Sequence, residues 1–131
     1  MPREARASIG TRRYETRVSV GPHGLVADEP GELGGDDRGP APTELLLSAI
    51  AACKVITARM YADRKGWPVE RIDAVARAAG ASGHQITRIE VALEVVGGLT
   101  DEQRRRVLEV ADKCPVQKAV RAGTVVVSRL A

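Results

Sequence analysis

A long segment without glycine or internal proline constrains the fold of this chain more than any other feature. It runs from Pro42 to about Lys65, and its first half, PTELLLSAIAAC, is rich in leucine and alanine, which are strong helix formers. That half is apolar almost all the way round, whereas a surface helix would carry one polar face. We therefore expect a helix that lies inside a core or a subunit interface. Near its middle stands Cys53, one of two cysteines in the chain.

The composition favours one domain with an aliphatic core. The chain has 131 residues, enough to bury a core, but one tryptophan, two tyrosines and no phenylalanine. Because an aromatic-poor core often gains burial from a second subunit, we expect a homodimer. The net charge of +3 is spread through both halves, and no basic stripe is interleaved with aromatic residues. The sequence therefore predicts no nucleic acid partner.

The compartment is predicted from what the chain lacks. We find no run of about 18 apolar residues, which is the length that spans a membrane. The first residues, MPREAR, do not have the apolar stretch of a signal peptide. We therefore expect a cytoplasmic protein with no membrane partner. Structural disulfides are rare in that compartment, so a cysteine pair there is more often redox-active or metal-binding.

Alternation and turn residues predict the first half of the chain. Residues 1–28 are expected to form an N-terminal β-hairpin, because apolar and polar residues alternate up to residue 20 and GPHG at 21–24 is a turn signal. Residues 29–42 are rich in Gly, Pro and Asp and are predicted to be a loop of functional length. The central helix is expected at residues 43–66, with Pro42 in its first turn and Thr43 as its cap.

The second half is predicted to return to the sheet. Strands are expected within residues 69–97, where apolar residues alternate clearly from Ile89 to Val95, and residues 80–83 read as a turn. TDEQ at 100–103 is a capping box that opens a second helix over residues 100–121, with a break at Pro115. Residues 124–130 are predicted to be a last strand. This order indicates an α+β fold with helices packed on antiparallel sheet.

Cys53 has two readings. A cysteine in the middle of a helix is most often a small buried hydrophobe. However, Ala49 and Ala52 are small neighbours that leave room for a pocket, and the adjacent Lys54 supplies a cation that favours the reactive thiolate.

Cys114 stands between Lys113 and Pro115 at the predicted break between helices. With Cys53 it forms either a peroxidatic and resolving pair, a structural disulfide, or two unrelated core thiols. Their separation of 61 residues in the sequence does not decide between these.

A zinc site is the remaining reading of the cysteines. Cys53 and Cys114 together with His23 and His84 would supply four ligands, but none of them shows the close spacing of structural zinc sites. We predict no metal site and two solvated loop histidines. The chain also has no Gly-rich nucleotide-binding turn.

The segments around both cysteines resemble those of a known family. The segment GPAPTELLL at residues 39–47, which leads through two alanines to Cys53, resembles the central helix of the OsmC/Ohr family. DKCPV at 112–116 resembles the family's second cysteine segment, and DEP at 28–30, GG at 34–35 and ITRI at 86–89 fit the same pattern. The resemblance covers essentially the whole chain.

The resemblance implies a fold and an activity. The fold would have antiparallel sheets around two long central helices in an intertwined homodimer, with active sites at the subunit interface. The activity would be that of a thiol-dependent peroxidase that reduces organic hydroperoxides. Cys53 would be the peroxidatic thiol and Cys114 the resolving thiol. A dihydrolipoyl protein or a small thiol would reduce their disulfide again, without metal, haem or flavin.

The charged residues depart from the family pattern. Peroxidases of the family place a Glu ten residues before the first cysteine, paired with an Arg that holds the thiolate. Here that position is Thr43, and Glu44 is nine residues before Cys53. Nine residues turn an ideal helix by about 900°, which puts Glu44 nearly opposite the thiol. Glu44 thus either orients the arginine through a helix bulge or a dimer contact, or is a first-turn acid that favours the helix dipole.

Three arginines are candidates for the partner of the thiolate. Arg12 occupies the hairpin position of the family, Arg13 lies beside it on the other strand face, and Arg38 is the loop candidate. An arginine at each of these positions is more often a solvated charge. The predicted catalytic set is therefore Cys53, Cys114, Arg12 and Glu44.

Two further hypotheses remain open. In the first, the chain is a non-catalytic dimeric module that binds an apolar small molecule along the helical face of Cys53, formed by Leu46, Ile50, Ile56 and Met60. Such a stripe is more often simply core. In the other hypothesis both thiols are passive packing.

Overall fold

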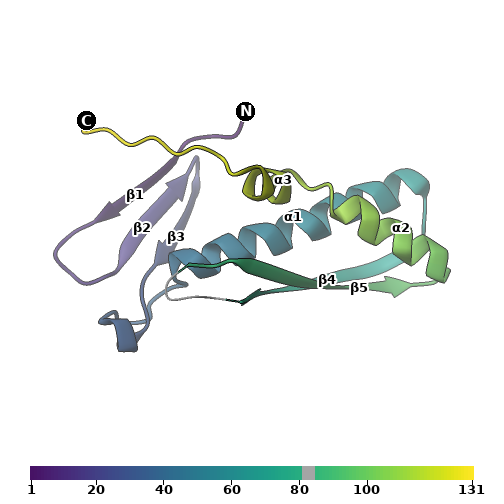
Figure 1. Ribbon diagram of the computed structural model, residues 1–131, viewed down its shortest axis with the longest axis horizontal. Coiled ribbons are helices and arrows are strands. Elements are labelled where there is room, and N and C mark those ends of the chain that lie inside the picture. The colour runs from purple at the N-terminus through teal and green to yellow at the C-terminus, as the bar shows by residue number, and fades with distance from the viewer. Residues whose placement is uncertain (81–84) are drawn as a thin grey trace. The chain divides into compact units, whose positions relative to one another are not determined.

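The structure is a computed structural model that describes residues 1–80 and 85–131. Its contacts group the chain into two compact units, residues 1–46 and residues 47–131. The expectation of a single domain remains a prediction. The secondary structure is α+β, with two small antiparallel sheets and the helices α1 to α3 (Figure 1), as the sequence predicts.

The first unit contains a three-stranded antiparallel sheet in the order β1-β2-β3. Its strands are β1 (Ala5–Ile9), β2 (Thr16–Val20) and β3 (His23–Ala27). The β2–β3 pair is the predicted hairpin, and Gly21 in its turn has φ 56°, a conformation that favours glycine. The separate strand β1 was not distinguished in the sequence. All five of its residues are exposed, so it carries no buried alternation to mark it.

The predicted loop after β3 contains one short regular element, the 3₁₀ turn η1 (Gly31–Leu33). Helix α1 (Pro42–Lys65) follows, within one residue of the predicted range. Because α1 begins at Pro42, Thr43 lies inside its first turn and is not the cap, which corrects that expectation. The helix ends at Gly66, whose φ of 68° is a left-handed conformation that commonly ends helices.

Helix α1 is more apolar than the sequence analysis allowed. By length and composition alone it meets the criterion for a membrane-spanning helix, since an 18-residue window has a mean hydropathy of 1.5, and 22% of that window is buried. The expectation that the chain has no membrane partner stays a prediction. Core helices of soluble proteins have the same length and hydropathy, so this property by itself does not place α1 in a membrane.

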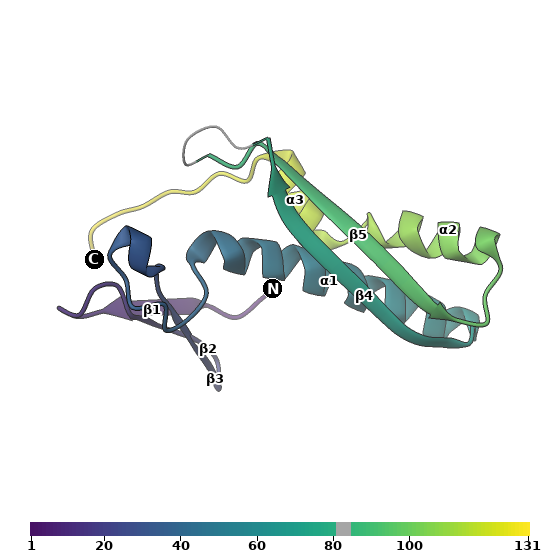
Figure 2. The same cartoon turned by 90° about the horizontal axis from the view of Figure 1, so that it is seen from below.

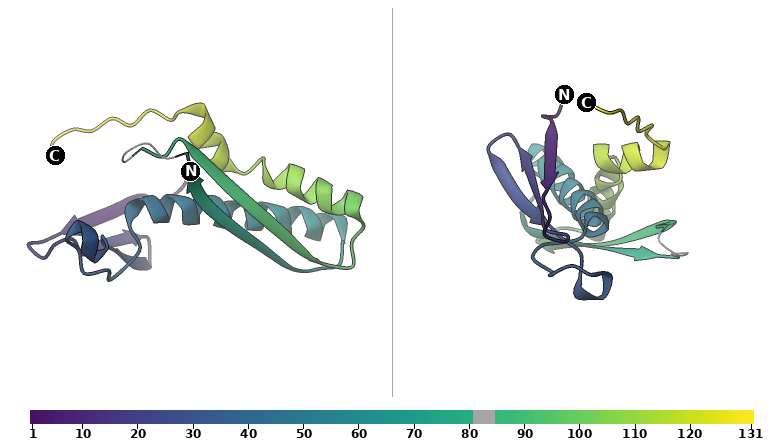
Figure 3. Two further views of the ribbon diagram at one scale, coloured as in Figure 1. Left: turned by 60° about the horizontal axis from the view of Figure 1, so that its bottom comes forward. Right: turned by 90° about the vertical axis from the view of Figure 1, so that its left-hand side faces the viewer.

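The second unit contains the antiparallel hairpin β4 (Val69–Ala79) and β5 (Arg88–Gly97), as predicted for residues 69–97. Of the predicted turn at 80–83, residues 81–83 lie outside the described residues, as does His84. Helices α1 and α2 (Asp101–Ala111) lie on one face of this hairpin (Figures 2 and 3). The break predicted at Pro115 within residues 100–121 is confirmed, because α2 ends at Ala111 and a separate helix, α3 (Pro115–Ala122), follows it.

A capping box begins α2, as predicted. The Thr100 hydroxyl accepts a hydrogen bond from the backbone N–H of Gln103, and the Gln103 side chain accepts one from the backbone N–H of Thr100. The guanidinium of Arg104 then donates to the backbone carbonyls of Val95, Gly97 and Leu99. These bonds fix the start of α2 against the end of β5.

The small core of the second unit joins α1 to α2. Ala58, Val107 and Ala111 are completely buried. The partly buried residues packed against them come from the hairpin and its flanking turns: Trp67, Ile72, Leu93, Val95 and Leu99. Alanine at the helix contacts lets the two backbones approach closely, which suits an aliphatic core with few aromatic residues.

The predicted strand at residues 124–130 is wrong. These residues have no regular secondary structure, and Val125, Val126 and Val127 are 82–85% exposed. A strand requires hydrogen bonds to a neighbouring strand. In the described part of the chain neither sheet includes this segment, so its backbone has no strand partner.

Candidate functional site

The fold brings the two cysteines together from different elements. Cys53 lies in the middle of α1, and Cys114 is the N-cap residue of α3, at the break after α2. Both are free thiols, and Cys53 lies close enough to Cys114 to raise the pKa of the Cys114 thiol. The two thiols are therefore neighbours, a point that their separation in the sequence left open.

Cys114 is held in a defined environment at the start of α3. Its side chain is completely buried, and its sulfur accepts a hydrogen bond of 3.4 Å from the backbone N–H of Gln117. Pro115 occupies the first helical position, where its lack of an N–H costs no hydrogen bond. Helix α3 therefore begins immediately after Cys114, and a backbone N–H of its first turn points at the sulfur.

Burial controls the protonation of Cys114. Burial raises the pKa of the Cys114 thiol above its ordinary value, and the contact with Cys53 raises it further. The N–H of Gln117 and the charge of Lys54 act in the opposite direction but do not cancel the increase in this pKa. Cys114 is thus a protonated thiol at neutral pH. Cys53 is half-buried, so it is the thiol that a reagent from solvent reaches.

An ion pair also links α1 to the segment that carries Cys114. The ammonium nitrogen of Lys54 lies 2.6 Å from Oδ1 of Asp112. The Lys54 side chain is 5% exposed, whereas that of Asp112 is 55% exposed. Lys54 follows Cys53 in α1, and Asp112 precedes Cys114 by two residues. The sequence pointed to Lys54 but gave no signal for this partner.

A cleft of about 420 Å³ opens beside the ion pair. Lys54, Asp112 and Gln117 are among the residues that line it, and Arg88 and Arg121 are its other charged residues. The rest of its wall is mainly aliphatic: Ile50, Ile86, Ile89, Val91, Leu93, Leu108 and Val120, with Thr87.

The apolar stripe expected along α1 lies mostly outside this cleft. Ile50 lines it, but Leu46, Ile56 and Met60 are 38%, 53% and 62% exposed. Those three residues are therefore not core within a single chain.

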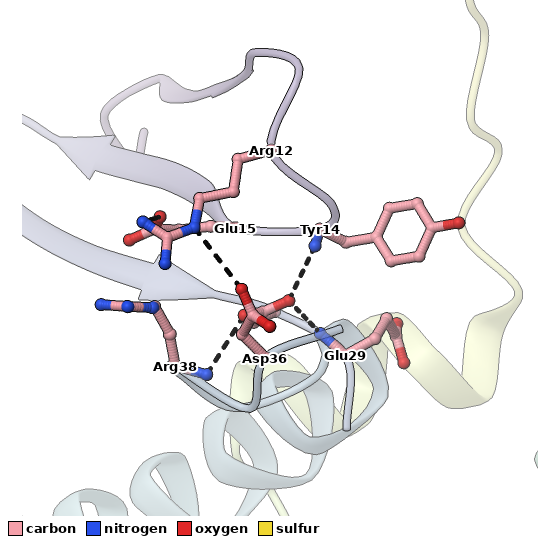
Figure 4. Close-up of polar contacts among 7 residues, drawn as sticks. Arg12, Tyr14, Glu15, Glu29, Asp36 and Arg38 are labelled. Carbon is pink, nitrogen blue, oxygen red and sulfur yellow. Dashed lines mark hydrogen bonds and ion pairs between the residues drawn. The ribbon is translucent and has the colours of Figure 1, made fainter. Parts of the chain in front are cut away.

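The candidate arginines lie in the first unit, around the buried carboxylate of Asp28. This carboxylate accepts backbone N–H hydrogen bonds from Tyr14 at 3.1 Å, Glu29 at 2.7 Å and Arg38 at 3.1 Å (Figure 4). Burial alone would raise the pKa of Asp28, but the backbone hydrogen bonds outweigh it and hold the pKa below its ordinary value. Asp28 thus ties the strand connection that carries Arg12 to the loop.

Arg12 is already engaged in ion pairs. Its guanidinium lies 3.5 Å from the carboxylate of Glu15 and 3.4 Å from that of Asp36, and its side chain is 55% exposed (Figure 4). Arg13 is exposed, and Arg38 is held through its backbone. The role of Arg12 at the thiolate stays a prediction.

Glu44 acts at the start of α1. Its Oε1 accepts a hydrogen bond of 2.8 Å from the backbone N–H of Ala41, the residue that precedes the helix. This contact supports the reading of Glu44 as a first-turn residue that stabilises the helix start. Its role in orienting an arginine stays a prediction.

The zinc hypothesis can be examined in part. Over residues 1–80 and 85–131, no group of three or more His, Cys, Asp or Glu side chains is placed to hold a metal ion. His84, one of the four candidate ligands, lies outside these ranges. His23 is exposed at the first position of β3.

The fold and the site define a small α+β protein with two interacting thiols, one at the middle of a long helix and one at the start of a short helix. The family model described as OsmC-like protein matches residues 34–129. The chain belongs to the OsmC-like protein family. No curated protein matches it.

Solved structures of this family share the fold. The OsmC-like protein of Mycoplasma pneumoniae has a TM-score of 0.77 at 15% identity, over 95% of this chain and 90% of that chain. The organic hydroperoxide resistance protein of Legionella pneumophila has a TM-score of 0.68 at 24% identity, over 92% and 90%. A Vibrio cholerae protein described as an organic hydroperoxide resistance protein, with captopril in one of its active sites, has a TM-score of 0.69 at 28% identity, over 94% and 86%.

Proposed function

We propose that this protein is a thiol-dependent peroxidase that reduces organic hydroperoxides in peroxide defence. The observation that carries the proposal is the direct interaction of Cys53 with Cys114 within an OsmC-like fold. The names of the Legionella and Vibrio relatives, both organic hydroperoxide resistance proteins, support the same substrate class.

The first chemical step takes place at Cys53. The Cys53 thiolate attacks the distal oxygen of the hydroperoxide, the O–O bond breaks, and the leaving alkoxide takes a proton to become the alcohol. Cys53 becomes a sulfenic acid and carries the oxygen. The half-buried position of Cys53 supports this order, because the buried Cys114 is less accessible to a substrate.

The second step uses Cys114. Its sulfur attacks the Cys53 sulfenic acid, an S–S bond forms, and hydroxide leaves and is protonated to water. The hydroperoxide is thereby reduced by two electrons and the dithiol is oxidised. An external thiol or a dihydrolipoyl protein would return the disulfide to two thiols in the cytoplasm, without a bound cofactor.

Arg12 and Glu44 are the charged residues of the proposed mechanism. Arg12 would stabilise the Cys53 thiolate, with Glu44 orienting it. Separate Arg12→Met, Arg13→Met and Arg38→Met variants test this, since the arginine that serves the thiolate should slow Cys53 oxidation when it is replaced. Equal rates in all three variants would remove arginine from the mechanism.

A homodimer is part of the proposal. Leu46, Ile56 and Met60 leave apolar area of α1 exposed in the single chain. A second copy that covers this helix would bury that area and contribute to stability. Sedimentation equilibrium should give twice the mass of one chain, and a monomer at micromolar concentration would count against the dimer.

Intact mass after one equivalent of cumene hydroperoxide tests the enzymatic proposal. The wild type should lose ~2 Da as the disulfide forms, and Cys114→Ser should gain ~16 Da as Cys53 retains one oxygen. Cys53→Ser is the matched control and should remain unmodified. A wild type that keeps its reduced mass for minutes would contradict the proposal.

The cleft of about 420 Å³ supports a second candidate function. Its aliphatic wall suits an apolar small molecule bound by a non-catalytic dimeric module. Saturable binding of an apolar fluorescent probe that survives Cys53→Ser, without peroxide consumption by the wild type, would favour this alternative.

A further inference from the structure

We propose that Lys54 is a positioning residue for the resolving step, in which its buried ammonium, anchored by Asp112, stabilises the thiolate of Cys114 as this sulfur attacks Cys53. The inference rests on the proposed function, because it assigns a residue to its second step. It makes a distinct claim: the cation serves the resolving thiol and not the peroxidatic one.

The burial of Lys54 is the first observation. A lysine side chain with 5% exposure would lose most of its hydration, which is costly for an unpaired charge. Asp112 compensates this cost through the contact of 2.6 Å. Because Asp112 is 55% exposed and sits at the C-terminal end of α2, it fixes the ammonium at the helix break that carries Cys114.

The direction of the side chain is the second observation. Adjacent residues of an α-helix point about 100° apart, so Lys54 does not follow the direction of Cys53 although it is next to it in α1. Its ammonium instead reaches Asp112, two residues before Cys114 in the chain. The charge of Lys54 is therefore held beside the segment that carries Cys114.

The third observation is the raised pKa of the Cys114 thiol. A thiol attacks as its thiolate, and burial raises the pKa of Cys114, so less thiolate is present at neutral pH. The Lys54 charge lowers this pKa and so offsets part of the cost of burial. The N–H of Gln117 at the start of α3 acts in the same direction.

The other groups near this thiol are identified. From α1 they are Cys53 and Lys54, and from the end of α2 Asp112, whose negative charge opposes that of Lys54. Arg88 of β5 and Arg121 of α3 line the adjoining cleft. Lys54 differs from these two arginines because it is buried against the thiol segment, where its charge is less screened by water.

Atoms and electrons balance in the resolving step without any added oxidant or reductant. Cys114 loses its proton to water, its sulfur forms the S–S bond with Cys53, and the S–O bond of the sulfenic acid breaks. The released hydroxide takes up a proton and leaves as water. Lys54 keeps its proton throughout and acts through its charge.

The test separates the two steps in time. Rapid quenching after one equivalent of cumene hydroperoxide gives the rate of sulfenic acid formation on Cys53 and the rate of disulfide formation. Lys54→Gln removes the cation but can still donate a hydrogen bond to Asp112. We expect disulfide formation at pH 7 to slow about tenfold, and its pH profile to move up by about one unit, with Cys53 oxidation within about twofold of the wild type.

Two controls distinguish a charge effect from a structural one. Lys113→Met removes an exposed lysine next to Cys114 and should leave both rates unchanged. Asp112→Asn removes the negative charge that opposes Lys54 but keeps a side-chain oxygen that can accept a hydrogen bond from the ammonium, so disulfide formation should be as fast as in the wild type or faster. If Lys54→Gln and Asp112→Asn slow the reaction alike, or if both steps slow together in Lys54→Gln, the pair is a structural tether and the inference is wrong.

A second measurement does not require peroxide. In a Cys53→Ser background, thiolate absorbance near 240 nm gives the pKa of Cys114 directly, and Lys54→Met should raise this pKa by about one unit. An unchanged pKa overturns the inference even if the wild type is a peroxidase. If Lys54→Met raises the pKa of Cys114 but the wild type does not reduce hydroperoxides, the effect of Lys54 on Cys114 stands and the proposed function is wrong.

Discussion

Oε1 of Glu44 accepts a hydrogen bond from the backbone N–H of Ala41 and so completes the first turn of α1. Glutamine can accept the same bond at this position, whereas alanine cannot. We expect Glu44→Ala to lower the free energy of unfolding by about 1 kcal/mol and Glu44→Gln to change it by much less. Urea unfolding followed by circular dichroism measures both.

The same two variants separate the readings of Glu44. A Glu44→Gln protein that is stable but oxidises Cys53 slowly would give the carboxylate charge a role at the active site. A Glu44→Gln protein with normal rates would leave Glu44 with its role at the helix start alone.

Asp28 should give the first unit a stability that depends on pH. Its carboxylate accepts three backbone N–H groups and has a lowered pKa, so the ionised form stabilises the folded state. The contribution of Asp28 to the free energy of unfolding is fully present above the ordinary carboxyl pKa. It is lost as the pH falls through the lowered pKa of Asp28 in the folded protein. We expect Asp28→Asn to lower the urea midpoint at pH 7, and the difference from wild type to shrink in acid below about pH 4.

Asp37→Asn is the matched control for this prediction, because Asp37 is exposed and lies in the same loop. Its urea midpoint should follow the wild type at both pH values. A difference between Asp28→Asn and wild type that stays constant from pH 7 to pH 3 would show that charge plays no part in the role of Asp28.

Gly39 allows the loop to lie close against β3. A Cβ atom on Gly39 would lie 2.0 Å from the carbonyl oxygen of Val26, so the backbone would have to move. We expect Gly39→Ala to lower the free energy of unfolding by about 1–3 kcal/mol, as for other substitutions that overfill a packed site. Gly10→Ala has nothing within 4 Å of the new Cβ atom and serves as the control in the same urea measurement. Equal stability of both variants would contradict the contact.

Local patterns account for the parts of the fold that were predicted correctly. The α1 segment, the alternation in β5 and the Thr100 capping box depend on residues within a few positions of each other, which a sequence displays directly. The errors arise where the structure of a segment depends on another segment that is distant in the sequence. An apolar run at 124–130 becomes a strand only if another strand can pair with it, and β1 is too exposed to show its period.

The site was predictable to a smaller extent. Resemblance to a family identified Cys53 and Cys114 as a pair, but no pattern in the residues placed them in contact. The Lys54–Asp112 ion pair spans 58 positions and depends on how α1 and α2 pack, so no spacing rule reveals it. Asp28 was noted as part of a motif, and its function as an acceptor for three N–H groups emerged from the folded loop alone.

The unequal burial of the two cysteines predicts selective alkylation. Cys53 is half-buried, whereas Cys114 is completely buried and has a raised pKa. In the reduced, folded protein at pH 7, we expect iodoacetamide to modify Cys53 at least about tenfold faster than Cys114, because Cys53 is more accessible and the raised pKa of Cys114 leaves less thiolate on that sulfur. Peptide mass spectrometry after timed quenching measures both rates, and the protein unfolded in guanidinium provides the control in which the two rates should converge. Slow and equal modification of both thiols in the folded protein would instead support the hypothesis of passive packing, since neither sulfur would then be open to a substrate.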